Sequence, residues 1–404
     1  MTDKIEFSLD GKSVTAEPGE TIWEVAKREG TTIPHLCHSG EKGYRSDGNC
    51  RACMVEIDGE RVLAASCIRT PSPDMVVKSE SHRAKSARKM VMELLVADQP
   101  AQDVAHDKSS HLWDMADLQG VSTSRFPALE PDRIPLLDNS HVAMSVNLDA
   151  CIQCNLCVRA CREVQVNDVI GLAGRGQDAK IVFDLDDPMG ESSCVACGEC
   201  VQACPTGALM PATVVDAAQV GDSMDFDKEV KSVCPFCGVG CQISLKIKDN
   251  KVKWVDGIDG PANENRLCVK GRFGFDYIDH KHRLTKPLIR LENAPKGLNV
   301  DPGNPLTHFR EASWEEAMDV AANGLKGRGT EVAGFGSAKC SNEEAYLFQK
   351  FIRQGFGHNN VDHCTRLCHA SSVAALMENV GSAAVTATFN EIENADVAIV
   401  IGSN

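Results

Sequence analysis

The sequence lacks the features of a membrane-bound or exported protein. Its 404 residues contain no long apolar run and no twin-arginine pattern, and the opening MTDKIEFSLDGKSV does not resemble a signal peptide. Positive charge is also scarce, because 42 Lys and Arg stand against 57 Asp and Glu, and the net charge is −15. This balance disfavours non-specific binding to nucleic acid or anionic membranes. The sequence therefore predicts a soluble, cytoplasmic protein with no nucleic-acid and no membrane partner.

Cysteine is abundant, with 19 residues. A cytoplasmic compartment keeps thiols reduced, so a disulfide framework is disfavoured and metal ligation is the better interpretation. The cysteines fall into sets of four, eight and four, with three left over. The chain is also too long for one compact core, which indicates two to four domains.

Local patterns predict the elements around these sets. Residues 4–16 read as a hairpin around Asp10-Gly11, and Thr21 with Glu24 predicts a capped helix. Two further strands flank Asp58-Gly59. A helix is expected over 82–98, with Met90, Val91, Leu94 and Leu95 on its apolar face, whereas the stretch that follows it shows no clear periodicity.

The last third alternates between predicted strands and helices. Ser313 and Ser341 each precede a helical pattern as caps, EVAGFGS reads as a short buried strand, and DVAIVIGSN reads as an apolar strand running into a glycine loop. The resulting parallel sheet would be unfinished. We therefore expect the sequence to be part of a longer protein.

The eight-cysteine region repeats one spacing twice. The run Cys-x2-Cys-x2-Cys-x3-Cys occurs over 151–161 and again over 194–204. In two-cluster ferredoxins the fourth cysteine of each run ligates the other cluster. We predict one [4Fe–4S] cluster on Cys151, Cys154, Cys157 and Cys204, and a second on Cys194, Cys197, Cys200 and Cys161. A pair of zinc ribbons is the alternative.

Two further sets have different spacings. Cys37, Cys50, Cys53 and Cys67 lie on the small β-rich unit and suit a [2Fe–2S] cluster, with a zinc knuckle as the alternative. Cys234, Cys237, Cys241 and Cys268 can hold another cubane. Lys270 follows this set by two residues and is either a positive bridge to a neighbouring group or a solvated surface lysine.

Three cysteines remain, Cys340, Cys364 and Cys368. In VDHCTRLCHASS, Cys364 and Cys368 stand one helical turn apart, with His363 and His369 beside them. From spacing alone the segment could be a zinc site, buried core, or a redox-metal ligand beside a proton-handling histidine. Cys340 is expected to pack.

Taken together, the motifs resemble the α subunit of cytoplasmic NAD-dependent molybdenum or tungsten formate dehydrogenases. The first 210 residues also resemble the iron–sulfur subunit of NADH:quinone oxidoreductase. CPFCGVGC…LCVKGR resembles the [4Fe–4S] segment of bis-molybdopterin-guanine-dinucleotide (bis-MGD) oxidoreductases, and HCTRLCHASS resembles the formate dehydrogenase active-site loop. By this resemblance Cys368 is the metal ligand, His369 is its proton-handling neighbour, and Lys270 lies between cluster and pterin.

The resemblance implies an α+β multidomain fold. Its parts are a β-grasp-like [2Fe–2S] ferredoxin domain at 1–80, a helical connector at 81–140, a two-cluster bacterial-type ferredoxin domain at 141–215, a [4Fe–4S] domain at 227–285, and the start of an α/β bis-MGD oxidoreductase domain at 286–404, truncated. Gly334, Gly336, Gly402 and Asn404 are expected to touch the pterin nucleotides. Related chains carry one more cluster on a His and three Cys, but AHDKSSHLWDMADLQG keeps His106 and has no cysteine.

The implied cofactors are one [2Fe–2S] cluster, three [4Fe–4S] clusters and a Mo or W bis-MGD. The implied reaction is reversible formate oxidation to CO2, with electrons passed to a partner. That partner is a flavin- and NAD-binding subunit with a small iron–sulfur subunit, in a hetero-oligomer whose dimerisation stays open. The alternatives are an electron-transfer subunit of an NADH dehydrogenase-like or hydrogenase-like complex, another bis-MGD enzyme such as a nitrate reductase, and a zinc-organised scaffold.

Overall fold

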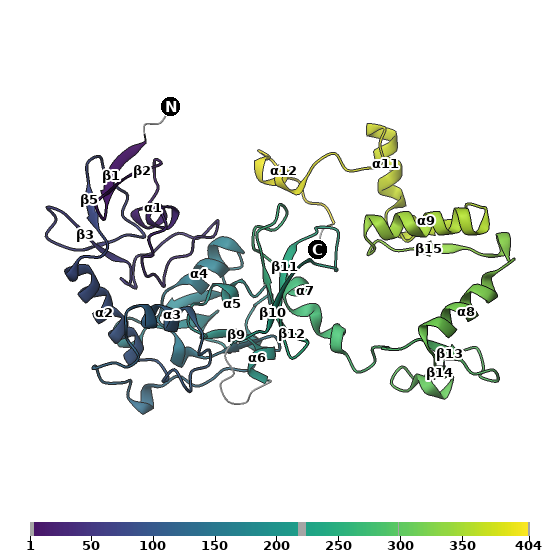
Figure 1. Cartoon of the computed structure of the whole chain (residues 1–404), viewed down its shortest axis with the longest axis horizontal. Helices are drawn as coiled ribbons and strands as arrows, with labels where there is room; N and C mark the ends of the chain where they lie inside the picture. Colours follow the sequence, from purple (N-terminus) through teal and green to yellow (C-terminus); the bar gives the residue numbers. More distant parts are fainter. Residues whose placement is uncertain (1–3, 217–223, 298, 403–404) are drawn as a thin grey trace. The chain divides into compact units, whose positions relative to one another are not determined.

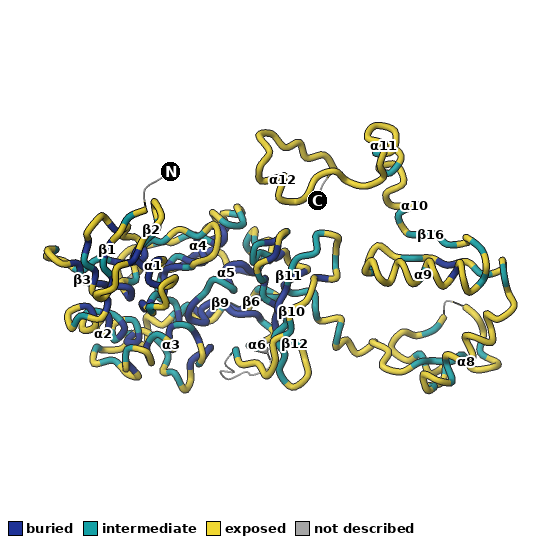
Figure 2. Tube along the Cα trace, turned by 45° about the horizontal axis from the view of Figure 1, so that its top comes forward, coloured by how far each residue is buried: buried dark blue, intermediate teal, exposed yellow. Residues whose placement is uncertain are grey.

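A computed structural model of the chain describes residues 4–216, 224–297 and 299–402. Two compact units are present. The first comprises Met1–Ser232, Ile243–Asp259 and Glu264–Phe273, and the second comprises Val233–Gln242, Gly260–Asn263 and Gly274–Asn404. Buried residues run through the first unit, whereas the second is largely exposed, as the dark and yellow segments of Figure 2 show. No helix of the described residues is both long and apolar enough to cross a membrane.

The N-terminal part of the first unit is a mixed five-stranded sheet with one helix beside it (Figure 1). The strands are β1 (Ile5–Leu9), β2 (Lys12–Ala16), β3 (Met54–Ile57), β4 (Ala64–Ala65) and β5 (Val76–Lys78), in the order β2-β1-β5-β3-β4, and the helix is α1 (Ile22–Arg28). The hairpin prediction is confirmed, since β1 and β2 are antiparallel and Asp10 and Gly11 have φ of 49° and 82°. Cys53 and Cys67 are buried in the core of this sheet.

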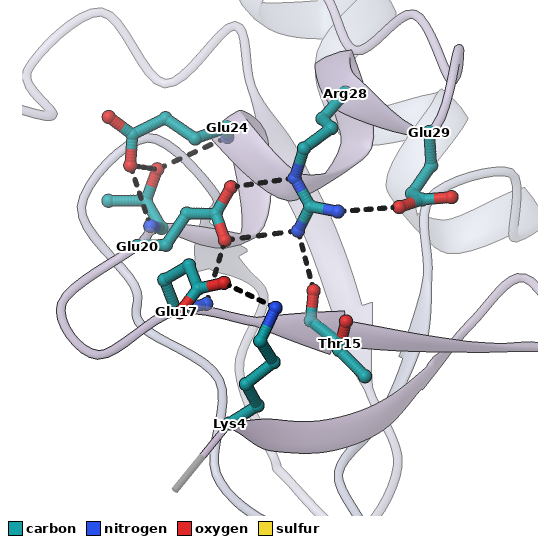
Figure 3. A network of polar contacts seen from close by, with 8 residues as sticks. Lys4, Thr15, Glu17, Glu20, Glu24, Arg28 and Glu29 are labelled. Atoms are coloured by element: carbon teal, nitrogen blue, oxygen red, sulfur yellow. Dashed lines mark hydrogen bonds and ion pairs between the residues drawn. The ribbon is translucent and has the colours of Figure 1, made fainter. Parts of the chain in front are cut away.

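Helix α1 begins at the predicted capping box. Thr21 accepts the backbone N–H of Glu24 at 3.3 Å, and the Glu24 carboxylate accepts the backbone N–H of Thr21 at 2.7 Å. Figure 3 shows how the end of the helix is tied to the sheet, because Arg28 donates to the Thr15 carbonyl of β2 at 2.5 Å and pairs with Glu20 at 3.1 Å. These exposed pairs fix the orientation of α1 more than they stabilise it.

Helices α2 (His82–Ala97) and α3 (His111–Leu118) follow. The first was predicted, but its buried face was placed wrongly: Met90 and Leu94 are exposed, and Val91 and Leu95 are half-buried. The helix instead buries Ala84, Arg88, Met92 and Val96. Arg88 can be buried because it donates to the Ser79 carbonyl at 2.7 Å and pairs with Glu80 at 3.1 Å. Helix α3 lies within the expected helical connector at 81–140, although periodicity did not predict its bounds.

The remainder of the first unit contains two β-ribbons, short helices and a three-stranded sheet. The ribbons are β6 (Met144–Val146) with β9 (Leu209–Pro211) and β7 (Ile170–Ala173) with β8 (Lys180–Phe183), both antiparallel. The helices are α4 (Leu156–Arg159), α5 (Glu199–Ala203), α6 (Ala212–Asp216) and α7 (Val269–Phe273). Strands β10 (Lys228–Val233), β11 (Gln242–Lys248) and β12 (Lys251–Gly257) form the sheet.

The second unit has two small sheets and five α-helices in its described residues. Strands β13 (Leu288–Arg290) and β14 (Phe309–Glu311) are antiparallel, and β15 (Gly334–Gly336) and β16 (Val361–His363) are parallel. The helices are α8 (Trp314–Leu325), α9 (Asn342–Phe356), α10 (Thr365–Cys368), α11 (Ala370–Val380) and α12 (Phe389–Asn394). The predicted caps are confirmed, because Ser313 and Ser341 accept backbone N–H groups of α8 and α9.

Two strand predictions in this unit need correction. The segment around β15 was expected to be buried, yet Phe335 is 81% exposed and only Gly334 is buried. The segment 396–401 was expected to form an apolar strand, but no strand is formed there and its residues are exposed. A strand needs a hydrogen-bonded neighbour, and no strand of the described residues pairs with this segment.

The corrected face of α2 makes a matched pair of variants. Met92 is fully buried and Met90 is 46% exposed. We expect Met92→Ala to lower the free energy of unfolding by about 2–5 kcal/mol, since it leaves a cavity, and Met90→Ala to change it by less than about 0.5 kcal/mol. Denaturant unfolding, with hydrogen exchange of the α2 amides, measures both. Equal losses in the two variants would contradict the observed face.

Candidate iron–sulfur and metal-binding sites

The four N-terminal cysteines come together although Cys37 and Cys67 lie 30 residues apart in sequence. Hydrogen bonds from the Cys50 and Cys67 thiols lower the pKa of Cys37 to about 2, and a hydrogen bond from Cys67 lowers the pKa of Cys53 to about 7. In return, the pKa values of Cys50 and Cys67 are raised. The backbone N–H of Cys50 also points to the Cys37 sulfur at 3.5 Å. Thiols this close together cannot all ionise without a counter-charge, which a metal centre would supply.

The repeated ferredoxin spacing is visible in the backbone. In the first run Gln153 and Asn155 have φ of 54° and 65°, and in the second run Ala196 and Gly198 have φ of 56° and 70°. These left-handed residues turn the chain around each set of three cysteines. The loops also aim N–H groups at sulfur: Gln153 donates to Cys151 and Ala196 donates to Cys194, each at 3.4 Å.

The fourth cysteine of each run lies with the other run. Cys204 acts electrostatically on the first three cysteines of the first run, and Cys161 acts on those of the second run. A cavity is lined by Cys151, Cys154, Cys157 and Cys204 together with mostly apolar residues. Burial raises the pKa values of Cys154, Cys157 and Cys200, so each pocket disfavours bare thiolates and suits thiolates bound to a cation.

The N-terminal set adjoins the first ferredoxin set. Cys37, Cys154 and Leu156 form one buried cluster, with Cys50 packed against it. Cys37 also contributes to the raised pKa of Cys154, although burial is the largest cause. Cysteines of two predicted centres therefore belong to one packed cluster, with side chains and not solvent between them.

The fourth set is divided between the two units. Cys234, Cys237 and Cys241 belong to the second unit, where the backbone N–H of Cys234 donates to the Cys241 carbonyl at 2.9 Å. Cys268 belongs to the first unit, immediately before α7, and Lys270 is an exposed residue of that helix. This ligand set and the bridging role of Lys270 stay predictions.

The candidate active-site loop follows β16. Cys364 is the N-cap of α10, Cys368 is its last residue, and His369 begins the turn into α11; all three are exposed. The Cys364 sulfur accepts the backbone N–H of Ala338 at 3.2 Å, which ties this loop to the loop after β15. Because β15 and β16 are parallel, both loops leave the same edge of the sheet.

The predicted nucleotide-contacting glycines differ in their surroundings. A Cβ on Gly334 would lie 2.7 Å from the Ile352 side chain, so this glycine allows α9 to pack on the strand. A Cβ on Gly336 would lie 3.2 Å from the His363 ring. Gly402 has a φ of 62° and open space around it, and Asn404 lies outside the described residues. Their contacts with a nucleotide stay predictions.

Two histidines in the cysteine-free stretch have ordinary partners. His106 pairs with Asp149 at 2.9 Å, and the rings of His111 and His35 lie 4.8 Å apart between centroids. Leu112 and Trp113 of α3 fill the core beside them. In the described parts of the chain, neither histidine stands with two other His, Cys, Asp or Glu side chains as ligands of a single metal ion would.

One buried pair of charges was missed by the sequence analysis. Arg272 of α7 and Glu199 of α5 have side chains 2% and 5% exposed, and they pair at 3.3 Å. The signal lay in the repeat: the residue before the third cysteine is Leu156 in one run and Glu199 in the other. An acidic residue at only one of two equivalent positions indicates that only that half of the repeat has a positively charged partner.

Comparisons with known proteins agree with this arrangement of domains. Residues 2–82 match a 2Fe-2S iron-sulfur cluster binding domain, 150–208 a 4Fe-4S dicluster domain, 227–280 a molybdopterin oxidoreductase Fe4S4 domain, and 283–404 a molybdopterin oxidoreductase domain. The predicted fold class is thereby confirmed in its order of domains. The matched segments are similar, in chain order, to two kinds of iron–sulfur domain and then to two domains of molybdopterin oxidoreductases.

Relatives cover the whole chain. It is 30% identical to a Staphylococcus haemolyticus protein and 28% identical to a Staphylococcus aureus protein, each named "Putative formate dehydrogenase". Both matches take in all of this chain, which spans 43% of the length of each of these relatives. A chain of an NAD+-reducing [NiFe]-hydrogenase shares 29% identity, with a TM-score of 0.47, over 51% of this chain and 87% of that one.

The close packing at Gly198 makes it a test of the second ferredoxin loop. A Cβ on Gly198 would lie 2.1 Å from the Arg272 side chain, whereas a Cβ on Gly59, which also has positive φ, meets nothing within 4 Å. We expect Gly198→Ala to lose about four irons per chain, one cubane's content, and Gly59→Ala to lose none. Iron and sulfide analysis after anaerobic preparation measures this. Full iron content in Gly198→Ala would contradict the packing.

Proposed function

We propose that the chain is the N-terminal part of the catalytic subunit of a molybdenum- or tungsten-dependent formate dehydrogenase. The observation that carries the proposal is the edge formed by β15 and β16. The loop with Cys368 and His369 leaves this edge beside the loop 337–341, and the Ala338 N–H to Cys364 bond joins the two. Ligands of open α/β sheets bind at the carboxyl ends of the strands.

The residues of this edge suit a bis-MGD centre. The exposed Cys368 thiol would ligate the metal, since thiolate is a strong ligand for such ions. A bound Mo or W bis-MGD would supply the two-electron oxidation of formate to CO2. His369, next along the chain, would orient formate or hold a proton on its imidazole. Lys270 would lie between this centre and the cluster held by Cys234, Cys237, Cys241 and Cys268.

The remaining cysteine sets suit one-electron carriers. We assign [4Fe–4S] clusters to the two sets in which the fourth cysteine comes from the other run (the crossed sets). We assign a [2Fe–2S] cluster to Cys37, Cys50, Cys53 and Cys67. Support comes from the N–H groups aimed at sulfur and from the cavity lined by the first crossed set, because hydrogen bonds to sulfur and burial are what such clusters use. Electrons would pass through the contact of Cys37 with Leu156 and Cys154 to the [2Fe–2S] cluster. From this cluster they would pass to a flavin- and NAD-binding partner.

The role of Cys368 is tested in the holoenzyme. We expect Cys368→Ser to abolish formate-dependent reduction of a viologen dye while leaving about fourteen irons in place (three cubanes and one two-iron centre). Cys340→Ser is the matched control, because Cys340 donates to the Ser337 carbonyl at 2.6 Å and a serine hydroxyl can do the same. Formate oxidation that persists in Cys368→Ser would favour an electron-transfer subunit without catalysis.

The crossed ligand sets are tested separately. Cys161→Ala should disturb the cluster of Cys194, Cys197 and Cys200 and spare the cluster of its own run. Cys204→Ala should do the reverse. Electron paramagnetic resonance of the reduced protein distinguishes the two outcomes. Cys197→Ser identifies the signal of the second cluster, and Cys154→Ser identifies the signal of the first. The same signal pattern in Cys161→Ala and Cys154→Ser would reject the crossing.

A further inference from the structure

The buried Arg272 lies against the second ferredoxin loop. Its Nε donates to the Cys197 carbonyl at 2.8 Å and one Nη donates to Gln202 at 2.7 Å. The other Nη reaches the Glu199 carboxylate at 3.3 Å. All of these partners lie on the segment that carries Cys197 and Cys200. The guanidinium is thus a fixed positive charge in a site from which water is excluded.

Only the second half of the ferredoxin repeat can accept this side chain. Arg272 passes over Gly198, where any Cβ would lie 2.1 Å from its Cδ. The equivalent residue of the first half is Asn155, which has nearly the same φ but carries a side chain. The next position is Glu199 in the second half and Leu156 in the first, and Leu156 packs against Cys37. The repeat therefore presents a cation at one cluster site and an apolar contact at the other.

The charge acts on the cysteines of the second set. Burial is the main cause of the raised pKa values of Cys197 and Cys200, and Arg272 opposes it for both. For Cys154 and Cys157 the acting neighbours are other thiols. Asp256 is the more distant carboxylate, at 3.8 Å from Arg272, whereas the guanidinium donates directly to the Cys197 carbonyl at 2.8 Å. The cation therefore favours negative charge at one cluster site only.

The cation is held in place from the N-terminal domain. Tyr44, in the loop between Cys37 and Cys50, donates its hydroxyl to Glu199 at 2.9 Å. In the same loop Lys42 pairs with Glu264 at 2.8 Å, and its carbonyl accepts from Arg266 at 2.9 Å, just before Cys268. Cluster-binding segments from three parts of the first unit are thus fastened together around Arg272.

We propose that Arg272 raises the reduction potential of the cluster on Cys161, Cys194, Cys197 and Cys200 above that of the other ferredoxin cluster. The inference rests on the cluster assignment of the proposed function. Reduction adds one electron to the cluster, and no bond is made or broken. A nearby buried cation stabilises the added negative charge more than an exposed one does, because solvent does not screen it. Arg272 is a positioning and tuning residue, not a catalytic one.

The test uses charge changes of opposite sign in the holoenzyme. Glu199→Gln removes the anion beside Arg272, so the reduced-to-oxidised ratio of this cluster, measured at its wild-type midpoint, should rise severalfold. The double variant Arg272→Gln/Glu199→Gln removes the cation without stranding a buried carboxylate. Its ratio should fall about tenfold, which is about 59 mV for a one-electron couple. Potentiometric titration followed by electron paramagnetic resonance measures both, and Cys197→Ser identifies the signal.

Arg162→Gln is the matched control. Arg162 stands next to Cys161 of the same cluster, but its side chain is 51% exposed and it pairs with Asp168. Its loss should change the ratio less than twofold. Unshifted potentials in both Glu199→Gln and the double variant, with full iron content, would overturn the proposal. If the double variant loses the cluster, Glu199→Gln alone decides the question. In that case an unchanged reduced-to-oxidised ratio in Glu199→Gln would overturn the proposal. Wild-type protein without four-iron signals would instead reject the cluster assignment itself.

Discussion

The first unit is organised by one electrostatic constraint: many thiols are buried close together, and they cannot all ionise without a counter-charge. The pKa values of Cys154, Cys157 and Cys200 are raised by burial, and the N-terminal thiols Cys37 and Cys50 share protons unequally. An iron–sulfur cluster supplies positive charge at the sulfur atoms and so removes the conflict. Metal loading and folding of this unit should therefore be coupled, as they are in small metal-binding domains.

The same constraint explains the backbone. A loop that wraps a cluster must bring three sulfurs and several N–H groups to one side within a few residues. Left-handed residues between the cysteines achieve this in both halves, at Gln153 and Asn155 and again at Ala196 and Gly198. Only one of these four is glycine, so the conformation costs free energy at the other three. That cost is tolerated where a ligand organises the loop.

Local features of the fold were predictable from sequence, and features that depend on a distant partner were not. The capping boxes at Thr21 and Ser341 and the turn at Asp10 are encoded within four residues, and the structure contains each of them. The core face of α2 depends on Arg88 finding the Ser79 carbonyl, which periodicity cannot reveal. The pairing of Glu199 with Arg272 joins positions 73 residues apart in the chain.

The asymmetry of the ferredoxin repeat follows from the same distinction. Cysteine spacing is identical in the two halves, so spacing predicts equivalent ligand sets for both. The surroundings of the two sets differ at two neighbouring positions, Asn155 against Gly198 and the residue before the third cysteine. Leu156 adapts the first half to an apolar neighbour, and Glu199 adapts the second half to a buried cation. Because solvation and nearby charge set cluster potentials, these two differences would give clusters on equal ligand sets unequal affinities for an electron.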